Sequence, residues 1–375
     1  MPAIASLVII AVFFQSQSEY FLSPGNLSNL AVQATLIAII ALGEIFVLLL
    51  ADIDLSLGSM SGVTCAVLGV LITNGHVPWL LAIFIMLAVG TALGAFQGWW
   101  IAWLGIPAFV VTLAGNMGFL GLQLYILGPD GTLSIFDPNV AALTGTQLAP
   151  SIGWILAAIV AVAVVASTLV RYVRGGVALR SLGRPIVIGV LIVGAVAIFN
   201  AYRGVPTPFL ILIGLLVISW WITMHTSPGR HLFAVGGNAE AARRAGIQVK
   251  RIRLAAFAVS GFFAAVGGLF AASYNGSAGT LTGGGTLLLE AIGAAVIGGT
   301  SLFGGRGTVW SALVGALIMA GVANGLNLMN SDQPIKYMVQ GVIVLLAVSL
   351  DTLLRRRQSR GRQLGAAIAL GTAAA

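Results

Sequence analysis

Long apolar runs, broken at intervals by Gly, Pro, polar or charged residues, dominate this chain. Several runs approach the roughly 20 residues that an α-helix needs to cross a bilayer. The breaks predict about twelve helices, and the two that start near 186 and 209 are short enough to be shallow or tilted. The predicted ranges are 2–18, 31–51, 57–73, 79–100, 107–127, 152–170, 186–200, 209–224, 253–273, 288–303, 309–329 and 335–352.

Composition supports this pattern, because 59% of the residues are hydrophobic and only 7% are charged. A soluble domain carries about 25% charged residues, so a soluble fold is excluded. Many glycines lie inside the apolar runs, for example Gly90, Gly94 and Gly98, where they let helices approach closely. We predict an all-α fold, a polytopic transmembrane helix bundle of about 10–12 membrane helices. It forms one domain, 1–353, followed by a basic cytoplasmic tail, 354–375, that is expected to be flexible.

The net charge of +8 does not indicate a nucleic-acid partner, because the basic residues lie in short segments between the apolar runs. All but two of the 18 Lys and Arg residues fall on one side of the predicted topology, and the exceptions are Arg203 and Lys336. Cytoplasmic loops near membrane helices are enriched in Lys and Arg. We therefore predict that both termini and the segment 225–252 are cytoplasmic and that membrane lipid surrounds the bundle.

Few residues could support a metal or redox site. Cys65 is the only cysteine, so an internal disulfide is impossible, and we predict neither a metal nor a cofactor. Asp52 and Asp54 could share one cation, or they could act as ordinary helix caps. The apolar stretch 3–14 has no basic residue before it, and we expect an uncleaved first helix, short enough for part of it to be missing.

The segment 225–252 is the longest predicted cytoplasmic connection. It combines Gly and Pro breakers, at Pro228, Gly229, Gly236 and Gly237, with a helix-forming stretch over 239–245. Asn238 is a natural N-cap for this helix, and Gly246 lies where a left-handed helix end favours glycine. A short capped helix with a small-residue face could enter a groove on a partner. Alternatively, the segment is a plain connection whose arginines only fix the topology.

Four ordered stretches indicate a family. GRHLFAVGGNAEAARRAGIQVKRIRLAAFAVSGFFAAVGG, residues 229–268, resembles the coupling-loop region of the monosaccharide branch of bacterial ABC importer permeases. The stretches 42–62, 105–122 and 290–316 are also similar to that family. The sequence GEIFVLLL and the extra pair of hydrophobic runs over 186–224 are most similar to the xylose type. Two features depart from the pattern: Ala51 and Asp52 stand where many relatives have Gly-Gly or Gly-Glu, and a basic N-terminal segment is missing.

This resemblance implies an ABC importer permease in the bacterial cytoplasmic (inner) membrane. It implies a homodimer whose interface encloses the path of a monosaccharide, with a pentose such as xylose expected, although the sequence itself does not name the sugar. The implied partners are an ATP-binding cassette ATPase subunit and a periplasmic or extracellular sugar-binding protein. The chain has no G-x-x-x-x-G-K-[ST] motif, so we expect no catalytic residues and ATP hydrolysis on the separate subunit. The residues expected to couple to the ATPase are Gly236, Gly237, Asn238, Ala241, Ala242, Arg243 and Gly246.

Polar residues within the predicted spans are candidates for the translocation path, because polar groups are costly in lipid and usually face the bundle interior. Equally, they could hydrogen-bond neighbouring helices, which is the expected role of Glu44 and Glu290. The path candidates are Asn116, Gln123, Tyr274, Asn275, Asn324 and Asn327, of which the last two are expected to share a helix face.

Two other functions compete with the importer reading. An ion-coupled secondary transporter of small polar solutes would work without an ATPase, but no third acid or histidine lies within the spans to complete a proton relay. A membrane enzyme acting on lipid-linked sugars would need an acidic or metal-binding cluster at one membrane face, and Asp52 and Asp54 are the only close pair.

Overall fold

The computed structural model describes residues 2–173, 183–346 and 348–349. Every predicted membrane helix has a counterpart, and six of the helices are long and apolar enough to cross a membrane: α2, α4, α5, α9, α12 and α14. The bounds are α1 (Pro2–Gln17), α2 (Pro24–Leu48), α3 (Leu57–Thr73), α4 (Trp79–Leu104), α5 (Ala108–Leu127), α7 (Pro150–Val173), α8 (Gly183–Asn200), α9 (Thr207–His225), α12 (Val249–Asn275), α13 (Leu287–Ile297), α14 (Trp310–Leu328) and a last helix, Gln333–Leu346.

Two helix boundaries differ clearly from the prediction. Helix α2 begins at Pro24 instead of 31, because the side chain of Ser23 accepts a hydrogen bond from the Asn26 amide and proline suits the first helical position. Helix α13 ends at Ile297 instead of 303. The chain beyond it turns through Gly299, Gly304 and Gly305, all with positive φ, which no helix continues.

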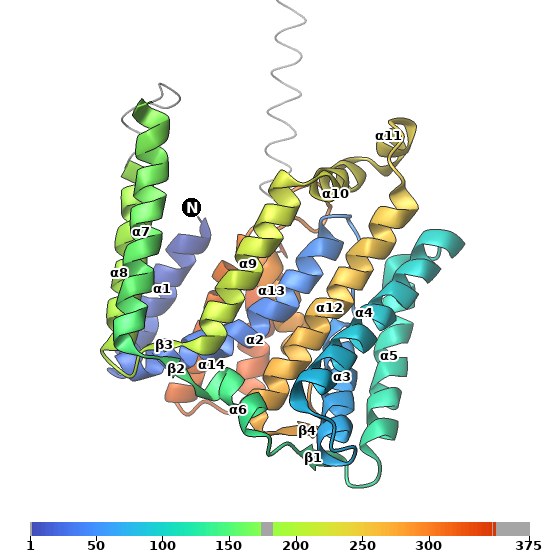
Figure 1. The fold of residues 1–375 in the computed structure, drawn as a ribbon, viewed down its shortest axis with the longest axis horizontal. Helices are drawn as coiled ribbons and strands as arrows, with labels where there is room; N and C mark the ends of the chain where they lie inside the picture. Colours follow the sequence, from blue (N-terminus) through green and yellow to red (C-terminus); the bar gives the residue numbers. More distant parts are fainter. Residues whose placement is uncertain (1, 174–182, 347, 350–375) are drawn as a thin grey trace, which may run out of the picture.

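The bundle has two distinct ends (Figure 1). The start of α1 lies at the same end as α10 (Ser227–Gly237) and α11 (Ala239–Arg244), which we call the coupling end. The opposite end, the strand end, carries α6 (Pro138–Gly145) and four short strands. There β1 (Thr132–Ser134) pairs with β4 (Ser277–Gly279), and β2 (Gln147–Leu148) pairs with β3 (Val205–Pro206), each antiparallel. These strands tie the connections of distant helices together.

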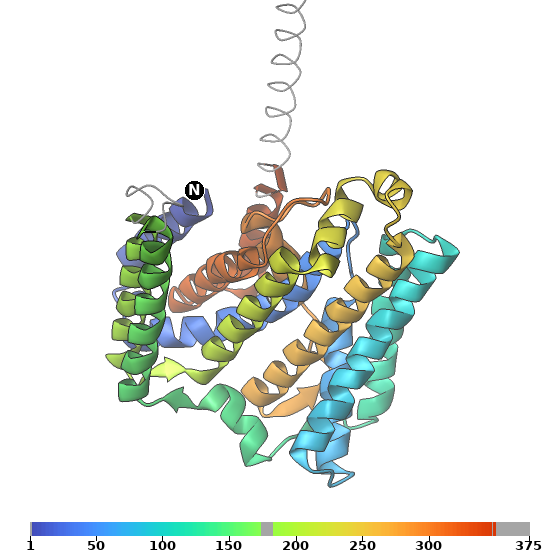
Figure 2. The same cartoon turned by 45° about the horizontal axis from the view of Figure 1, so that its top comes forward.

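Helices α2 and α12 form the centre of the bundle, and α12 runs between α4 and α9 (Figure 2). The contact between α4 and α12 is made through backbone, as the spacing of glycines predicted. A Cβ on Gly94 would overlap the Phe257 carbonyl, and a Cβ on Gly98 would lie 3.0 Å from the Leu254 Cα. A Cβ on Gly90 would lie 2.7 Å from the Gly261 carbonyl oxygen. These glycines therefore let two spans touch along their backbones.

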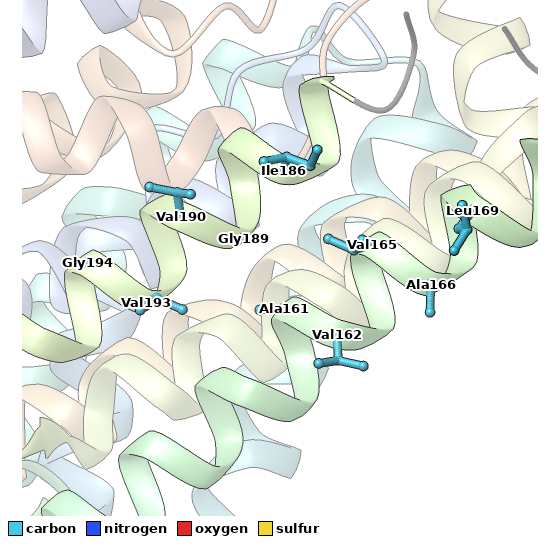
Figure 3. A pocket seen from close by; sticks show the side chains of 10 residues that line it. All are labelled: Ala161, Val162, Val165, Ala166, Leu169, Ile186, Gly189, Val190, Val193 and Gly194. Atoms are coloured by element: carbon cyan, nitrogen blue, oxygen red, sulfur yellow. The ribbon is translucent and has the colours of Figure 1, made fainter. Parts of the chain in front are cut away.

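Helices α7 and α8 pack on each other at the edge of the bundle (Figures 1 and 2). The sequence grouped α8 with α9, but α9 packs instead against α2 and α10. A cavity of ≈ 680 Å³ between α7 and α8 is lined entirely by apolar residues (Figure 3). It offers no side-chain hydrogen bond to a sugar hydroxyl, so this cavity is unsuited to a polar solute. Its lining residues are Ala161, Val162, Val165, Ala166, Leu169, Ile186, Gly189, Val190, Val193 and Gly194.

Candidate coupling and translocation sites

The connection at the coupling end contains two helices, whereas the sequence predicted one. Helix α10 begins at Ser227, and the Thr226 side chain caps it by accepting a hydrogen bond from the Gly229 amide. Pro228 and Gly229, predicted to be breakers, therefore lie inside α10, because proline is tolerated in the first turn, where its missing N–H is not needed.

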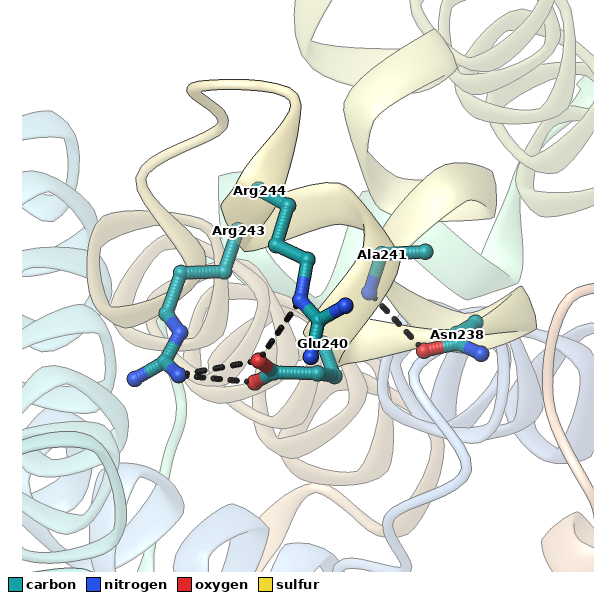
Figure 4. Close-up of polar contacts among 5 residues, drawn as sticks. All are labelled: Asn238, Glu240, Ala241, Arg243 and Arg244. Atoms are coloured by element: carbon teal, nitrogen blue, oxygen red, sulfur yellow. Dashed lines mark hydrogen bonds and ion pairs between the residues drawn. The ribbon is translucent and has the colours of Figure 1, made fainter.

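Helix α11 has both of the caps that the sequence predicted. The Asn238 side chain accepts a hydrogen bond of 2.9 Å from the Ala241 amide (Figure 4). Gly246 follows the helix with φ 85°, in the left-handed region. The two ends of this short helix are thus fixed by local contacts, and it projects from the bundle beside α10 (Figure 1).

The outer face of α11 carries a small ionic cluster (Figure 4). The Glu240 carboxylate pairs with Arg243 at 2.9 Å and with Arg244 at 3.1 Å, and all three side chains are exposed. Hydrogen bonds from Arg243 and then Arg244 lower the pKa of the Glu240 carboxyl. Exposed pairs of this kind contribute little stability, so their main effect is to hold the two guanidinium groups over the outer face.

One coupling residue does not face outward as expected. Ala242 is only 5% exposed and lies in the same apolar cluster as Leu232 and Val235 of α10. Ala242 therefore packs α11 against the rest of the chain, and its side chain is not available to enter a groove on a partner. Ala241, by contrast, is exposed beside Arg243 and offers the small surface that the sequence assigned to Ala242.

Gly236 lies where three separate segments meet. A Cβ on this residue would overlap the Leu49 carbonyl, just after α2, and would lie 2.8 Å from the Gly305 amide nitrogen. The Gly305 amide itself donates a 3.0 Å hydrogen bond to the Leu49 carbonyl. Gly237, the next residue, has open space around its Cβ position. Only Gly236 therefore needs to be glycine for packing.

Leu49 leads into the non-helical segment 49–56, which ends in a buried polar cluster. The Asp54 carboxylate accepts hydrogen bonds from the hydroxyls of Ser56, at 2.6 Å, and Ser260, at 2.8 Å. The Asp54 amide donates to the Glu44 carboxylate at 3.3 Å. The Asp54 carboxylate thus joins the start of α3 to α12. Glu44 of α2 bonds the segment 49–56 that follows its own helix, so the described structure shows no hydrogen bond from Glu44 to a second helix.

Asp52 and Asp54 do not converge on one cation position. Asp52 forms an ion pair of 3.3 Å with Arg253 at the start of α12, whereas Asp54 is held by two serines. Neither caps α3 directly, since the residue before that helix is Ser56 and its side chain makes no capping bond. Within residues 2–173, 183–346 and 348–349, no group of three or more His, Cys, Asp or Glu could hold a metal ion.

Two of the translocation candidates bond neighbouring segments instead. Gln123 of α5 is buried, and its amide donates to the carbonyls of Gly279 at 2.8 Å and Thr282 at 3.0 Å. Asn324 of α14 is also buried and exchanges hydrogen bonds of 2.8 and 3.0 Å with Asn26 of α2. Both residues therefore join elements of the bundle, the alternative that the sequence left open.

The remaining candidates are more accessible. Asn116 of α5 is half-buried, and Tyr274, Asn275 and Asn327 are exposed. Asn327 does not share the environment of Asn324, because the end of α14 emerges from the bundle within one turn. These four residues come from three helices, and in the described part of the chain no hydrogen bond joins their side chains.

The sequence drew attention to Glu290 but not to its partner. The Glu290 carboxylate accepts hydrogen bonds from the Thr286 hydroxyl at 2.7 Å and the Gln340 amide at 2.9 Å. The expected helix-end and interhelical role is confirmed. Gln340 is a polar residue within an apolar run, and the criterion applied to the other polar residues in spans would have selected it.

Replacing Gln123 with Leu is expected to lower the free energy of unfolding by about 1 to 3 kcal/mol, because the Gly279 and Thr282 carbonyls lose their donor. Asn116→Leu, the same type of change on the same helix, removes no such bond and should change stability by less than about 0.5 kcal/mol. Denaturation of both variants in detergent measures the difference. Equal stabilities would contradict the anchoring role of Gln123.

The sequence matches one described family over most of its length. Residues 26–348 match the family described as branched-chain amino acid transport system / permease component. Over 362 residues, the chain is 39% identical to the xylose transport system permease protein XylH of Escherichia coli (strain K12), covering 94% of this chain and 92% of that protein. No solved structure shows a significant match.

Two further relatives from Escherichia coli (strain K12) are similar over nearly their whole length. The D-allose transport system permease protein AlsC is 30% identical over 350 residues, covering 93% of this chain and 90% of that protein. The ribose import permease protein RbsC is 32% identical over 349 residues, covering 93% and 92% respectively. The similarity therefore extends through both ends of the bundle.

Proposed function

Because the chain belongs to the family of branched-chain amino acid transport system permease components, we propose that it forms the membrane path by which a pentose such as xylose enters the cell. It is a multi-pass permease subunit of an ABC importer in the bacterial inner membrane. The observation that carries the choice of sugar is the 39% identity to the xylose permease over 94% of this chain. Identity to the allose and ribose permeases is lower, at 30% and 32%.

The partners follow from this role. A separate ATPase subunit hydrolyses ATP and docks on α10 and α11, whose exposed residues at the coupling end include Gly237, Asn238, Ala241, Arg243 and Gly246. A sugar-binding protein delivers the pentose at the strand end, and a second copy of the chain completes the path. The support for the docking site is a short helix that is capped at both ends and exposed on its outer face.

The coupling end faces the cytoplasm in this proposal, with both termini on that side. The asymmetry of Lys and Arg supports it, because the described basic residues near α10, α11 and the start of α12 lie at that end, whereas Arg203 lies two residues before β3 at the strand end. Residues 1–353 form the permease domain. The basic tail, 354–375, lies outside the described residues.

Purified chain in lipid vesicles is expected to hydrolyse no ATP and to import no xylose by itself. Both activities should appear when the ATPase subunit is supplied on the side that carries α11 and the sugar-binding protein on the other. A thiol label on Ala239→Cys identifies that side. ATP hydrolysis by the chain alone, or xylose uptake driven by an ion gradient without the ATPase, would refute the proposed function.

A further inference from the structure

The segment between β4 and α13 is irregular backbone that reaches the first turn of α3. Gly283 contacts Gly58 and Gly62 so closely that a Cβ on it would overlap the Gly58 carbonyl and lie 2.7 Å from the Gly62 amide nitrogen. Gly58 is in the first turn of α3, which runs from there to the strand end. At a rise of 1.5 Å per residue, Gly283 lies about 20 Å from the end of that helix. The segment is therefore at the depth of the membrane interior.

This irregular segment is not covered by the rest of the chain. Leu281 is 86% exposed, and Gly284 and Gly285 are exposed as well. Non-helical backbone at membrane depth is tolerated only where it is buried in protein or lines a water-filled cavity, because lipid cannot hydrogen-bond its free amides and carbonyls. The face that carries this segment must therefore face water or a second protein surface, and not lipid.

Glu290 lies beside this segment, in the first turn of α13. Its Oε1 atom accepts hydrogen bonds from both Thr286 and Gln340, while within the described residues its Oε2 atom has no hydrogen bond and no ion pair with Lys or Arg. The Gln340 side chain is only 7% exposed, and its amide oxygen has no hydrogen-bond partner in the described structure. The Gln340 oxygen is itself buried, so the Oε2 atom of the half-buried Glu290 is the acceptor that a ligand on this face can reach.

We propose that Glu290, positioned by hydrogen bonds from Thr286 and Gln340, binds a hydroxyl group of the sugar as it passes along this face. The inference rests on the proposed function and names a contact within it. A neutral monosaccharide offers O–H donors, which suit a carboxylate oxygen that lacks one. Leu289, 58% exposed next to Glu290, provides an apolar surface for the C–H groups of the ring. The cavity between α7 and α8 has no such acceptors.

Water and sugar should both reach this face in the assembled importer. The native Cys65 is buried, so introduced cysteines can be labelled selectively. Leu289→Cys is expected to react with a charged, membrane-impermeant thiol reagent at least about tenfold faster than Val190→Cys, because a thiolate forms readily only in water. Val190 on α8 is 66% exposed in the chain but faces the apolar cavity, which makes it a matched control. Saturating xylose should slow the labelling of Leu289→Cys.

The uptake kinetics test this acceptor directly. Glu290→Leu is expected to raise the KM for xylose uptake about tenfold, with ATPase binding and ATP hydrolysis retained. Gln340→Leu removes a donor that positions the Glu290 carboxylate and should raise the KM by a smaller factor. Glu290→Gln keeps an acceptor oxygen and should have a smaller effect. Met338→Leu, a similarly sized apolar change on the helix that carries Gln340, should leave the KM unchanged.

The outcomes separate this site from the function it depends on. If the parental importer transports xylose but Glu290→Leu and Gln340→Leu keep the parental KM, the site is wrong and the permease assignment stands. Labelling of Leu289→Cys that is no faster than that of Val190→Cys, or that xylose does not slow, also overturns the site. If the parental chain with its ATPase transports no sugar, the proposed function fails first.

Discussion

Gly236→Ala is expected to lower ATP-driven xylose uptake about tenfold or more, whereas Gly214→Ala on α9 leaves uptake near the parental rate. The added methyl group on Gly236 would overlap the Leu49 carbonyl and crowd the Gly305 amide, so α10 must move away from the end of α2. Overpacking of this kind costs about 1 to 3 kcal/mol, and about 1.4 kcal/mol corresponds to a tenfold change in an equilibrium. At Gly214 nothing lies within 4 Å of the Cβ position.

Uptake of labelled xylose into vesicles that contain the complete importer measures the effect of the two substitutions. The amount of folded chain and its affinity for the ATPase are measured in parallel, since the expected defect is in transmission of the ATPase movement and not in assembly. Equal uptake by the two variants would show that the contact of α10 with Leu49 and Gly305 has no part in coupling.

Ala241→Trp is expected to weaken binding of the ATPase subunit about tenfold or more, because the new side chain would stand on the exposed face of α11, which we propose enters the partner's groove. Ala242→Trp should act differently. Ala242 is buried in the same apolar cluster as Leu232 and Val235, so tryptophan there would displace α11 and reduce the yield of folded chain. Substitution of Ala241 is therefore expected to affect docking of the ATPase, and substitution of Ala242 to affect folding of the chain.

Co-purification with the ATPase and size-exclusion chromatography in detergent distinguish these two defects. Ala241→Trp should elute as the parental chain does but lose the ATPase, whereas Ala242→Trp should be poorly recovered. An Ala241→Trp variant that binds the ATPase and transports normally would mean that α11 is only a connection between α10 and α12.

The sequence predicted best those features that local signals determine. Each apolar run corresponds to a helix in the described part of the chain, and Asn238 and Gly246 predicted both ends of α11, because capping depends on the residues next to a helix end. The start of α2 was missed, although Ser23 and Pro24 are a local signal, because the apolar run begins only later. Capping residues next to a helix end were therefore sufficient to predict that end wherever the prediction took them into account.

The candidate sites were harder, because they depend on contacts between distant segments. No pattern in the sequence shows that Ala242 faces inward while Ala241 faces out, since the choice depends on how α11 packs on α10. Likewise, the partner of Asn324 is Asn26, near the other end of the chain. Glu290 and Gln340 are 50 residues apart in sequence, and only the fold brings them into hydrogen-bond contact.

The glycine contact between α4 and α12 determines which parts of the importer can move separately. With the Gly94 position against the Phe257 carbonyl, sliding or rotation of either helix would drive side chains into backbone, so the two helices move as one rigid body. Helix α12 begins at Val249, a few residues after α11 ends at Arg244. A movement of the ATPase against α11 would consequently be transmitted by α4 and α12 together. The hinges of the transport cycle must then lie outside these two helices.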